Sequence, residues 1–215
     1  MKYSVFGTGA VGTTIAGKLI ENGHEVMMGS RTDSNEKGVA WVQSAGGKGK
    51  LGTFADAAKF SDIIFNCVKG DASLEVMKLA GAENLKGKII IDISNPLDFS
   101  KGFPPTLTVC NTDSVGEQIQ RTYPEALVVK TLNTTNCKVM VNPALVPGEH
   151  DLFLSGNDNN AKTKVRTVLE KEFGWKHIID LGDITTARGT EMLLPIWVRL
   201  YGALQTPNFN FHIVK

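Results

Sequence analysis

The chain lacks any large surplus of charge. Its 23 Lys and Arg residues are offset by 22 Asp and Glu among 215 residues, which leaves a net charge of +1. Proteins that bind nucleic acid or anionic lipid through their overall field need a basic surplus. The sequence therefore predicts neither a nucleic-acid partner nor a role at a membrane surface.

Cysteine is scarce, and long apolar runs are absent. The three cysteines, Cys67, Cys110 and Cys137, have no metal-ligand spacing, and a sparse, odd count is typical of a reducing compartment. No apolar run approaches the roughly 20 residues of a membrane-spanning helix. The N-terminus runs directly into an apolar strand, without the basic region and cleavage site of a signal peptide. We therefore expect a cytoplasmic protein without a membrane segment.

What is present is an alternation of short apolar segments with segments of helical period. Strands are predicted at 2–7, 24–30, 61–68, 87–96, 126–133, 151–156 and 176–182. The segment AGGKGKLGT is predicted to be a loop that leads to a further short strand. Helices are predicted between them, and a last helix is predicted over about 186–204. This pattern, with continuous apolar runs such as KIIIDI, indicates an α/β fold with a doubly wound, mostly parallel sheet. We expect one domain over 1–215, with about 183–215 as a small C-terminal extension of helix and tail.

Three glycines, Gly7, Gly9 and Gly12, form G-x-G-x-x-G between the first predicted strand and the first predicted helix. In that context the first glycine permits a tight turn, the second lets a pyrophosphate approach the backbone, and the third allows close helix–strand packing. The amides of Ala10 and Val11 would then donate to phosphate oxygens at the helix N-terminus. The motif between this strand and this helix favours dinucleotide binding in a Rossmann, NAD(P)-binding fold. The alternative is a glycine-rich turn with no ligand.

Ser30 and Arg31 end the second predicted strand, at the position where NAD-binding proteins carry an acidic residue that binds the adenosine ribose. An arginine there can pair bidentately with the 2'-phosphate of NADP, and a serine hydroxyl can donate to it. Thr8 lies close enough in the turn to assist, and Lys37 could add charge. The alternative is that Arg31 is an ordinary surface arginine and that Asp33 holds the ribose of NAD. The spacing favours NADP(H).

Three further predicted strands deliver polar loops to the same edge of the sheet, because ligands of such sheets bind beyond the carboxyl ends of the strands. Their amides, hydroxyls and carboxamides suit the second ribose and the nicotinamide carboxamide. The same residue types also form turns. The candidates in these loops are Val68, Lys69, Asn95, Pro96, Asn133 and Thr134.

No Ser–His–Asp set or carboxylate pair stands out, so no catalytic residue is predicted. Hydride transfer between stacked rings needs none, because the protein supplies orientation and exclusion of water. On the last predicted helix, Trp197 and Leu200 resemble packing or an oligomer face. Arg188 and Glu191 resemble surface charges of that helix.

At this point the chain resembles the NADPH-dependent oxidoreductases related to the archaeal reductase of the deazaflavin coenzyme F420. The resemblance is carried by VFGTGAVGTTIAGKLIENGHEVMMGSR, SDIIFNCV, KIIIDISNPL, VVKTLNT, DLFLSGND and ARGTEMLLPIWVRL. The cytoplasmic domains of six-transmembrane ferric reductases are similar in NPL, VVKTLNT and SGND.

The resemblance implies an NADPH-binding homodimer. It implies that Thr8, Ser30 and Arg31 hold the 2'-phosphate and that the segment around Asn133 and Thr134 meets the nicotinamide. It further implies that a deazaflavin, a flavin or a similar small oxidant is the second substrate and lies near the C-terminal extension.

Two rival functions remain in view. Imine reductases and β-hydroxyacid dehydrogenases share the N-terminal pattern but need a long helical domain, whereas only 65 residues follow His150 here. A non-catalytic NADP-binding sensor or partner module would use the same motif residues as an enzyme.

Overall fold

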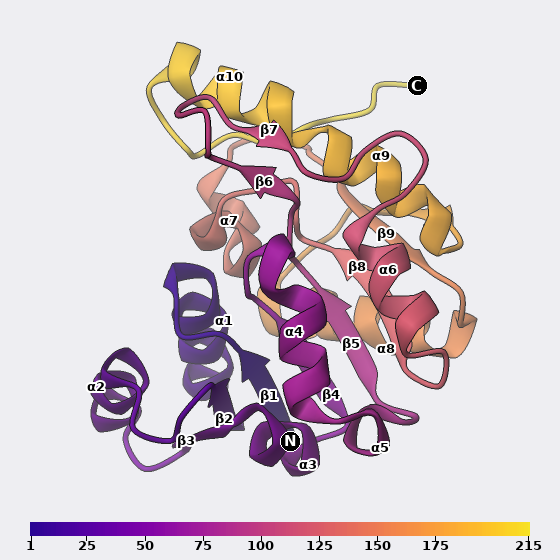
Figure 1. Ribbon diagram of the computed structural model, residues 1–215. Coiled ribbons are helices and arrows are strands. Elements are labelled where there is room, and N and C mark those ends of the chain that lie inside the picture. Colours follow the sequence, from indigo (N-terminus) through magenta and orange to yellow (C-terminus); the bar gives the residue numbers. More distant parts are fainter.

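The computed structural model describes residues 1–215, and an eight-stranded sheet forms its centre (Figure 1). The strand order is β10-β9-β8-β5-β4-β1-β2-β3. The strands are β1 (Lys2–Phe6), β2 (Glu25–Ser30), β3 (Gly49–Thr53), β4 (Ile63–Asn66), β5 (Ile89–Asp92), β8 (Leu127–Thr131), β9 (Leu152–Gly156) and β10 (Ile178–Gly182).

The strands from β3 to β8 pair in parallel, whereas β9 pairs antiparallel with β8. β10 then pairs in parallel with β9. The strand order reverses between β1 and β4, where Phe6 lies opposite Asn66. A doubly wound sheet binds its ligands at such a switch point, beyond the carboxyl ends of the strands. The predicted fold class is confirmed.

Helices cover both faces of the sheet. They are α1 (Ala10–Glu21), α2 (Glu36–Ser44), α3 (Phe54–Phe60), α4 (Gly70–Ala80), α5 (Ala82–Leu85), α6 (Val115–Thr122), α7 (Cys137–Val141), α8 (Asn159–Val168), α9 (Ala187–Met192) and α10 (Leu194–Leu204). Short helical turns lie at Pro143–Leu145, Leu169–Phe173 and Ile184–Thr186.

The central strands β1, β4, β5 and β8 contribute to two separate cores because their side chains alternate between the faces. On β5, Ile89 and Ile91 join the core that contains Ile15 of α1, whereas Ile90 joins the core that contains Met77 of α4. Burying each such side chain contributes about 1.5–3 kcal/mol. The continuous apolar run therefore reflects burial on both faces.

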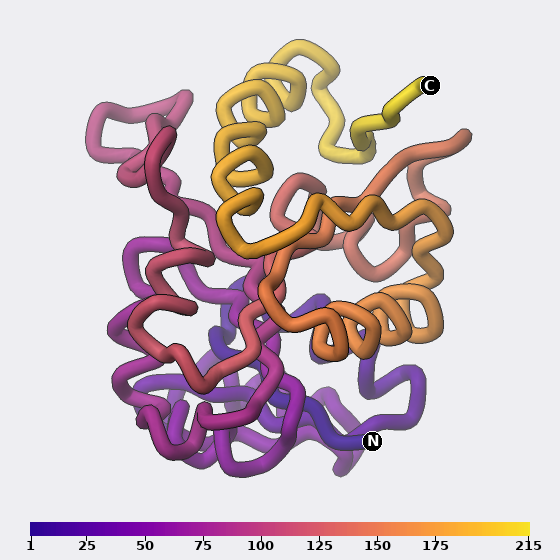
Figure 2. The backbone as a smooth tube through the Cα atoms, turned by 90° about the vertical axis from the view of Figure 1, so that its right-hand side faces the viewer, coloured from indigo at the N-terminus to yellow at the C-terminus, as the bar shows by residue number.

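The C-terminal helices lie at the end of the molecule where the parallel strands finish. Figures 1 and 2 show α9 and α10 there together with the hairpin of β6 (Leu97–Asp98) and β7 (Thr106–Leu107). Sequence analysis predicts a single last helix, but the chain breaks at Leu193 between α9 and α10. The reason is Pro195, which has no N–H to continue the helical ladder.

Candidate functional site

The three glycines after β1 perform different steric tasks. Gly7 has a φ of +106°, which L side chains rarely adopt, and it forms the turn. A Cβ on Gly12 would lie 2.1 Å from the Gly7 carbonyl oxygen, so only glycine permits this approach of α1 to the turn. A Cβ on Gly9 would meet no protein atom within 4 Å. The surface over Gly9 is therefore open to a ligand.

Helix α1 begins at this open surface. Gly9 provides no side-chain cap, and the first turn of α1 contains no acidic residue. The first amides of an uncapped helix lack partners within the helix and carry a partial positive charge. The amides of Ala10 and Val11 are thus placed to receive an anion.

A cavity of about 490 Å³ opens beside this turn, and we call it the Arg31 cavity. It joins the ends of β1, β2 and β4 to the start of α4. Its lining residues are Gly7, Thr8, Ser30, Arg31, Asn35, Phe54, Val68, Lys69, Asp71, Ala72 and Val76.

Two exposed cations, Arg31 and Lys69, line this cavity. Neither forms a salt bridge within the chain. Ser30 is buried and its hydroxyl donates to the Thr32 carbonyl, so the oxygen is left to accept. Asp33 and Lys37 are exposed and do not line the cavity. The competing carboxylate is therefore outside the pocket that holds Arg31.

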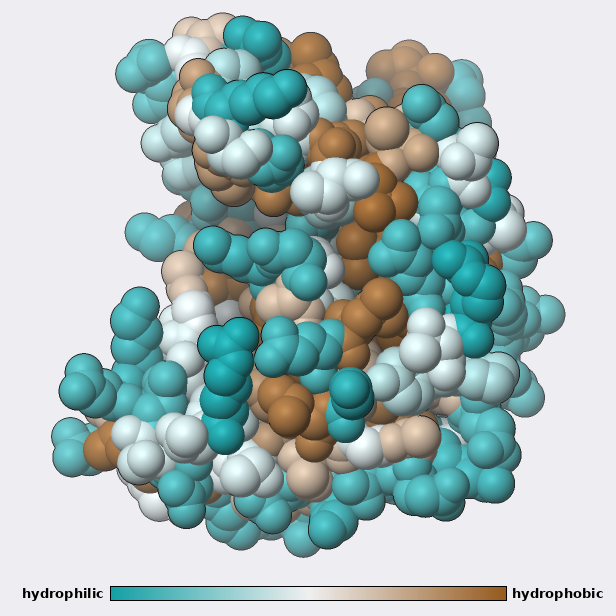
Figure 3. Space-filling model, in the orientation of Figure 1, coloured by the Kyte–Doolittle hydropathy of each residue, from teal (hydrophilic) through white to brown (hydrophobic).

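A second cavity of about 330 Å³ adjoins the first, because Val68 and Lys69 line both. We call it the Asn133 cavity. Figure 3 shows apolar surface gathered in the hollow middle of this face of the molecule. The residues that line the Asn133 cavity are Val11, Cys67, Val68, Lys69, Ile93, Ser94, Asn95, Leu97, Phe99, Asn133, Thr135, Asn136, Cys137, Met140, Leu194 and Trp197.

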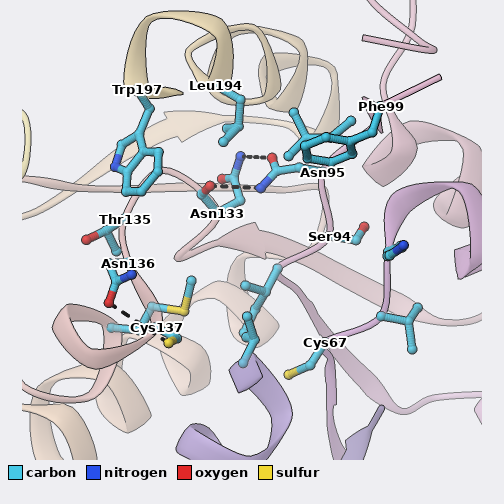
Figure 4. Close-up of a pocket in the computed structure, with 16 residues that line it drawn as sticks. Cys67, Ser94, Asn95, Phe99, Asn133, Thr135, Asn136, Cys137, Leu194 and Trp197 are labelled. Carbon is cyan, nitrogen blue, oxygen red and sulfur yellow. Dashed lines mark hydrogen bonds between the residues drawn. The ribbon is translucent and has the colours of Figure 1, made fainter. Parts of the chain in front are cut away.

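Two asparagines brace the middle of the Asn133 cavity (Figure 4). Asn95 Nδ2 donates to the Asn133 carbonyl and Asn133 Nδ2 donates to Asn95 Oδ1, both at 2.9 Å. The Gly70 amide donates to the Asn95 carbonyl at 3.1 Å, and a Cβ on Gly70 would lie 2.4 Å from that oxygen. The loops after β4, β5 and β8 are thus locked together.

The geometry therefore gives two adjoining cavities at the switch point, with a glycine turn, an open helix N-terminus and an unpaired arginine at one end. The model of the family described as "NADP oxidoreductase coenzyme F420-dependent" matches residues 2–96. A solved structure from Arthrobacter sp. FB24, described as a candidate F420-dependent NADP reductase, is 52% identical with a TM-score of 0.95, and each chain is covered over 100% of its length. This chain belongs to the coenzyme F420-dependent NADP oxidoreductase family.

Other relatives agree with this membership. The F420-dependent NADP reductase of Methanocaldococcus jannaschii is 28% identical over 93% of this chain and 92% of its own length. Metalloreductase STEAP3 of Rattus norvegicus is 26% identical over 91% of this chain, which spans 38% of that protein. Both resemblances stated from the sequence are confirmed, and the chain is an NADP-dependent oxidoreductase. No helix in the structure is long and apolar enough to cross a membrane.

Imine reductases share the fold but not the extent of the chain. The enzyme of Myxococcus stipitatus in complex with NADP+ is 20% identical with a TM-score of 0.63, and this chain covers 64% of it. After His150 the present chain forms β9, β10 and short helices. The long helical domain that the rival function requires is absent from residues 151–215.

The structure brings together most of the residues expected at the site, with two exceptions in the loops. Val68, Lys69, Asn95 and Asn133 line the Asn133 cavity as expected. Thr134 is 1% exposed and lines neither cavity; its neighbour Thr135 does. Pro96 is also buried outside the cavity. The chain leaves its strand after Thr131, so strand alternation no longer indicates which side chain faces the ligand.

Sequence reasoning missed the far wall of the cavity. Leu194 and Trp197 come from α10, and Phe99 follows β6 in the hairpin (Figure 4). Trp197 also stacks on Tyr201 and on Phe209 of the tail, with ring centroids 5.9 and 5.1 Å away. No local signal distinguishes such a residue from an ordinary packing residue, because only the fold of the C-terminal extension carries it to the cavity.

Glu191 was expected to be a surface charge, and that expectation is wrong. Its side chain is 2% exposed and lies 2.7 Å from Lys130 Nζ, which is itself fully buried and 2.8 Å from Asp92 Oδ2. Burial alone would lower the pKa of Lys130, but the two carboxylates raise it above its ordinary value. Arg188 forms a half-exposed ion pair with Glu117.

Proposed function

We propose that NADPH lies across the Arg31 and Asn133 cavities and that the acceptor lies against α10. The observation that carries this proposal is that the two cavities are neighbours and share Val68 and Lys69 as lining residues. One end offers a cation and the other a largely apolar, braced pocket. This polarity matches a ligand with a phosphate at one end and an aromatic ring at the other.

In this arrangement Arg31 and Thr8 bind the 2'-phosphate, and the amides of Ala10 and Val11 bind the pyrophosphate. The Asn95–Asn133 brace sets the wall beside the nicotinamide, while Leu194, Trp197 and Phe99 exclude water. NADPH, when bound, supplies the hydride. The chain needs no general acid or base for that step, only the orientation of two rings.

The acceptor is proposed to be a flavin-like ring. The reductases from Methanocaldococcus jannaschii and Arthrobacter are described as F420-dependent, and coenzyme F420 is a deazaflavin. The apolar wall of Leu194, Trp197 and Phe99 suits a planar ring. We therefore place coenzyme F420 first among the acceptors and the flavins second.

The test is NADPH oxidation by the purified protein with coenzyme F420, FMN, FAD and a ferric chelate in parallel, with NADH as the matched donor. We expect oxidation of NADPH by at least one ring acceptor and a much lower rate with NADH. Tight NADPH binding without turnover in any of these reactions would instead identify a sensor or partner module.

We further propose a cytoplasmic homodimer. Ile196, Tyr201 and Leu204 of α10 are exposed, at 47%, 42% and 52% respectively, and all three cysteines are free thiols. Apolar side chains grouped on one helix favour association. Sedimentation analysis is expected to give twice the monomer mass, and Tyr201→Glu is expected to shift it toward the monomer.

A further inference from the structure

A buried charged cluster adjoins the Asn133 cavity, and the proposed hydride transfer does not use it. It consists of Asp92 at the end of β5, Lys130 on β8 and Glu191 on α9, with side chains 0–2% exposed. Asp92 and Lys130 are direct partners in the β5–β8 register. Glu191 reaches the same ammonium from a segment distant in sequence. We call this set the Asp92–Lys130–Glu191 cluster.

One arm of the cluster holds a wall of the cavity through Ser94. Asp92 Oδ1 accepts from the Ser94 amide at 3.2 Å and from its hydroxyl at 2.7 Å. Lys130 Nζ donates to the Ser94 carbonyl. Every polar group of Ser94 is thus engaged. Because Ser94 and Asn95 both line the Asn133 cavity, Asp92 and Lys130 set the shape of its cofactor side.

The other arm holds the C-terminal helices. Glu191 Oε2 accepts from the Val115 amide at 2.9 Å, and Oε1 accepts from the Gly116 amide at 3.2 Å. These amides open α6, whose N-terminus offsets the second carboxylate of the cluster. Glu191 lies three residues before Leu194, which lines the cavity from α10 as Trp197 does (Figure 4). Glu191 therefore anchors the segment that supplies this wall of the cavity.

Both arms meet at one ammonium that is closed to solvent. A buried ionic contact is stiff, because breaking it leaves a charge without water or a partner. Movement of the Ser94–Asn95 wall is thus transmitted to Lys130, and from Lys130 to Glu191 and α9. The two walls of the cavity are therefore mechanically connected through Lys130, and we call this connection the joint.

We propose that the Asp92–Lys130–Glu191 cluster is a positioning device that sets the acceptor wall of the Asn133 cavity relative to its cofactor wall. Glu191 is the positioning residue of the acceptor wall, and Asp92 is that of the cofactor wall. The assignment of the walls rests on the proposed function. The mechanical joint between them follows from the contacts alone.

The first test measures the joint without any acceptor, by amide hydrogen exchange with and without NADP+. Binding to the wild-type protein is expected to slow exchange in residues 187–198 at least about fivefold, the lower end of ordinary coupling between sites. Glu191→Gln keeps the size of the side chain but removes its charge, and it is expected to abolish this slowing while residues 94–97 stay protected. Persistence of the slowing in Glu191→Gln would overturn the proposal.

The matched control is Ser4→Ala. It removes buried hydrogen bonds to the Ala57 carbonyl and the Ser61 hydroxyl, far from the cluster, so it lowers stability without touching the joint. It is expected to retain the NADP-dependent slowing in 187–198. If Glu191→Gln does not fold, Glu191→Asp replaces it, because the shorter side chain cannot reach Lys130 and both α6 amides together.

The second test is kinetic. With a ring acceptor, Glu191→Gln is expected to lower kcat about tenfold or more, the scale of a small misplacement of reacting groups, with the Kd of NADPH within about twofold of wild type. Asp92→Asn is expected to weaken NADPH binding. Unchanged kcat and KM in Glu191→Gln would show a purely stabilising contact. Absence of turnover in the wild type would refute the proposed function, whereas the exchange experiment would still decide the joint.

Discussion

At the scale of single residues, the glycine turn separates requirements of the fold from requirements of a ligand. Gly12 faces the Gly7 carbonyl at a distance that no Cβ tolerates. Gly9 has φ −81° and ψ −176°, an extended conformation open to any residue, and nothing of the protein lies over it. Neither the backbone conformation nor the packing of the folded chain therefore requires a glycine at position 9.

Gly9→Val is accordingly expected to fold with a Tm near wild type and to lose binding of both NADPH and NADH, because the side chain occupies the pyrophosphate position. Gly12→Ala is expected to lose about 1–3 kcal/mol of unfolding free energy or more through overpacking. Thermal unfolding and cofactor titration check both variants. Normal NADPH binding by Gly9→Val would refute the placement of the pyrophosphate.

Arg31 is the residue that we propose selects the cofactor. Arg31→Ala is expected to raise the Kd of NADPH about 10- to 100-fold, because a charge-assisted hydrogen bond contributes about 1.5–3 kcal/mol. The Kd of NADH is expected to change little, since NADH lacks the 2'-phosphate. Titration of both cofactors measures the difference.

Lys37→Ala is the matched control for Arg31, because Lys37 is an exposed cation of the same region that lies outside the Arg31 cavity. Its expected effect on NADPH is smaller. Equal losses from the two variants would mean that the region acts through general charge and not through a defined phosphate site.

At the scale of elements, α6 has polar contacts at both of its ends. Ser114 caps it by accepting from the Glu117 amide at 3.1 Å, and Arg121 in its last turn pairs with Asp113 at 2.9 Å. The hydrogen bond from Arg121 holds the pKa of Asp113 below its ordinary value of 3.8, against a smaller opposing effect of burial. The ends of α6 are thus tied together by charge.

The Arg121–Asp113 ion pair predicts how the stability of the protein depends on pH in the acid range. A folded-state pKa below the unfolded value contributes stability above the unfolded pKa, and that contribution is lost as the pH falls through the folded pKa. Asp113→Asn is therefore expected to be less stable than wild type at neutral pH, with the difference shrinking below about pH 4. Urea unfolding across that range measures it. A difference independent of pH would show that the carboxylate charge is not involved.

At the scale of the whole molecule, the two cavities bring together segments from both halves of the chain. The Arg31 cavity is lined from β2 and α4, and the Asn133 cavity is lined from the loop after β8 and from α10. A ligand that spans both stabilises the entire chain because it binds only the folded state.

NADPH at about 100 times its Kd is expected to add about 2.7 kcal/mol and to raise the Tm by about 5–10 °C. NADH at the same concentration is expected to add much less, and Gly9→Val is expected to show no rise. A thermal scan with each cofactor measures the effect. Equal shifts with NADPH and NADH would contradict selection by Arg31.

The sequence alone determined the sheet, the glycine turn, the choice of a phosphorylated cofactor and the family. These features can be predicted because each depends on a local pattern in the sequence. The patterns are the continuous apolar runs of strands buried on both faces, the G-x-G-x-x-G spacing, and Arg31 directly after its strand. The break between α9 and α10 also has a local cause, which is Pro195. The sequence analysis predicts one helix there because the apolar period continues across the proline.

Other features of the site depend on the tertiary structure, which brings Leu194 and Trp197 to the Asn133 cavity and buries Glu191 behind them. Glu191 reads as a surface charge on its own helix, and it is buried because α6 and β8 supply its partners from distant segments. Thr135 faces the cavity in place of Thr134 because the loop after β8 leaves the strand alternation. Such placements depend on which segments pack together. The residue spacing within one segment does not indicate which distant segment will cover it.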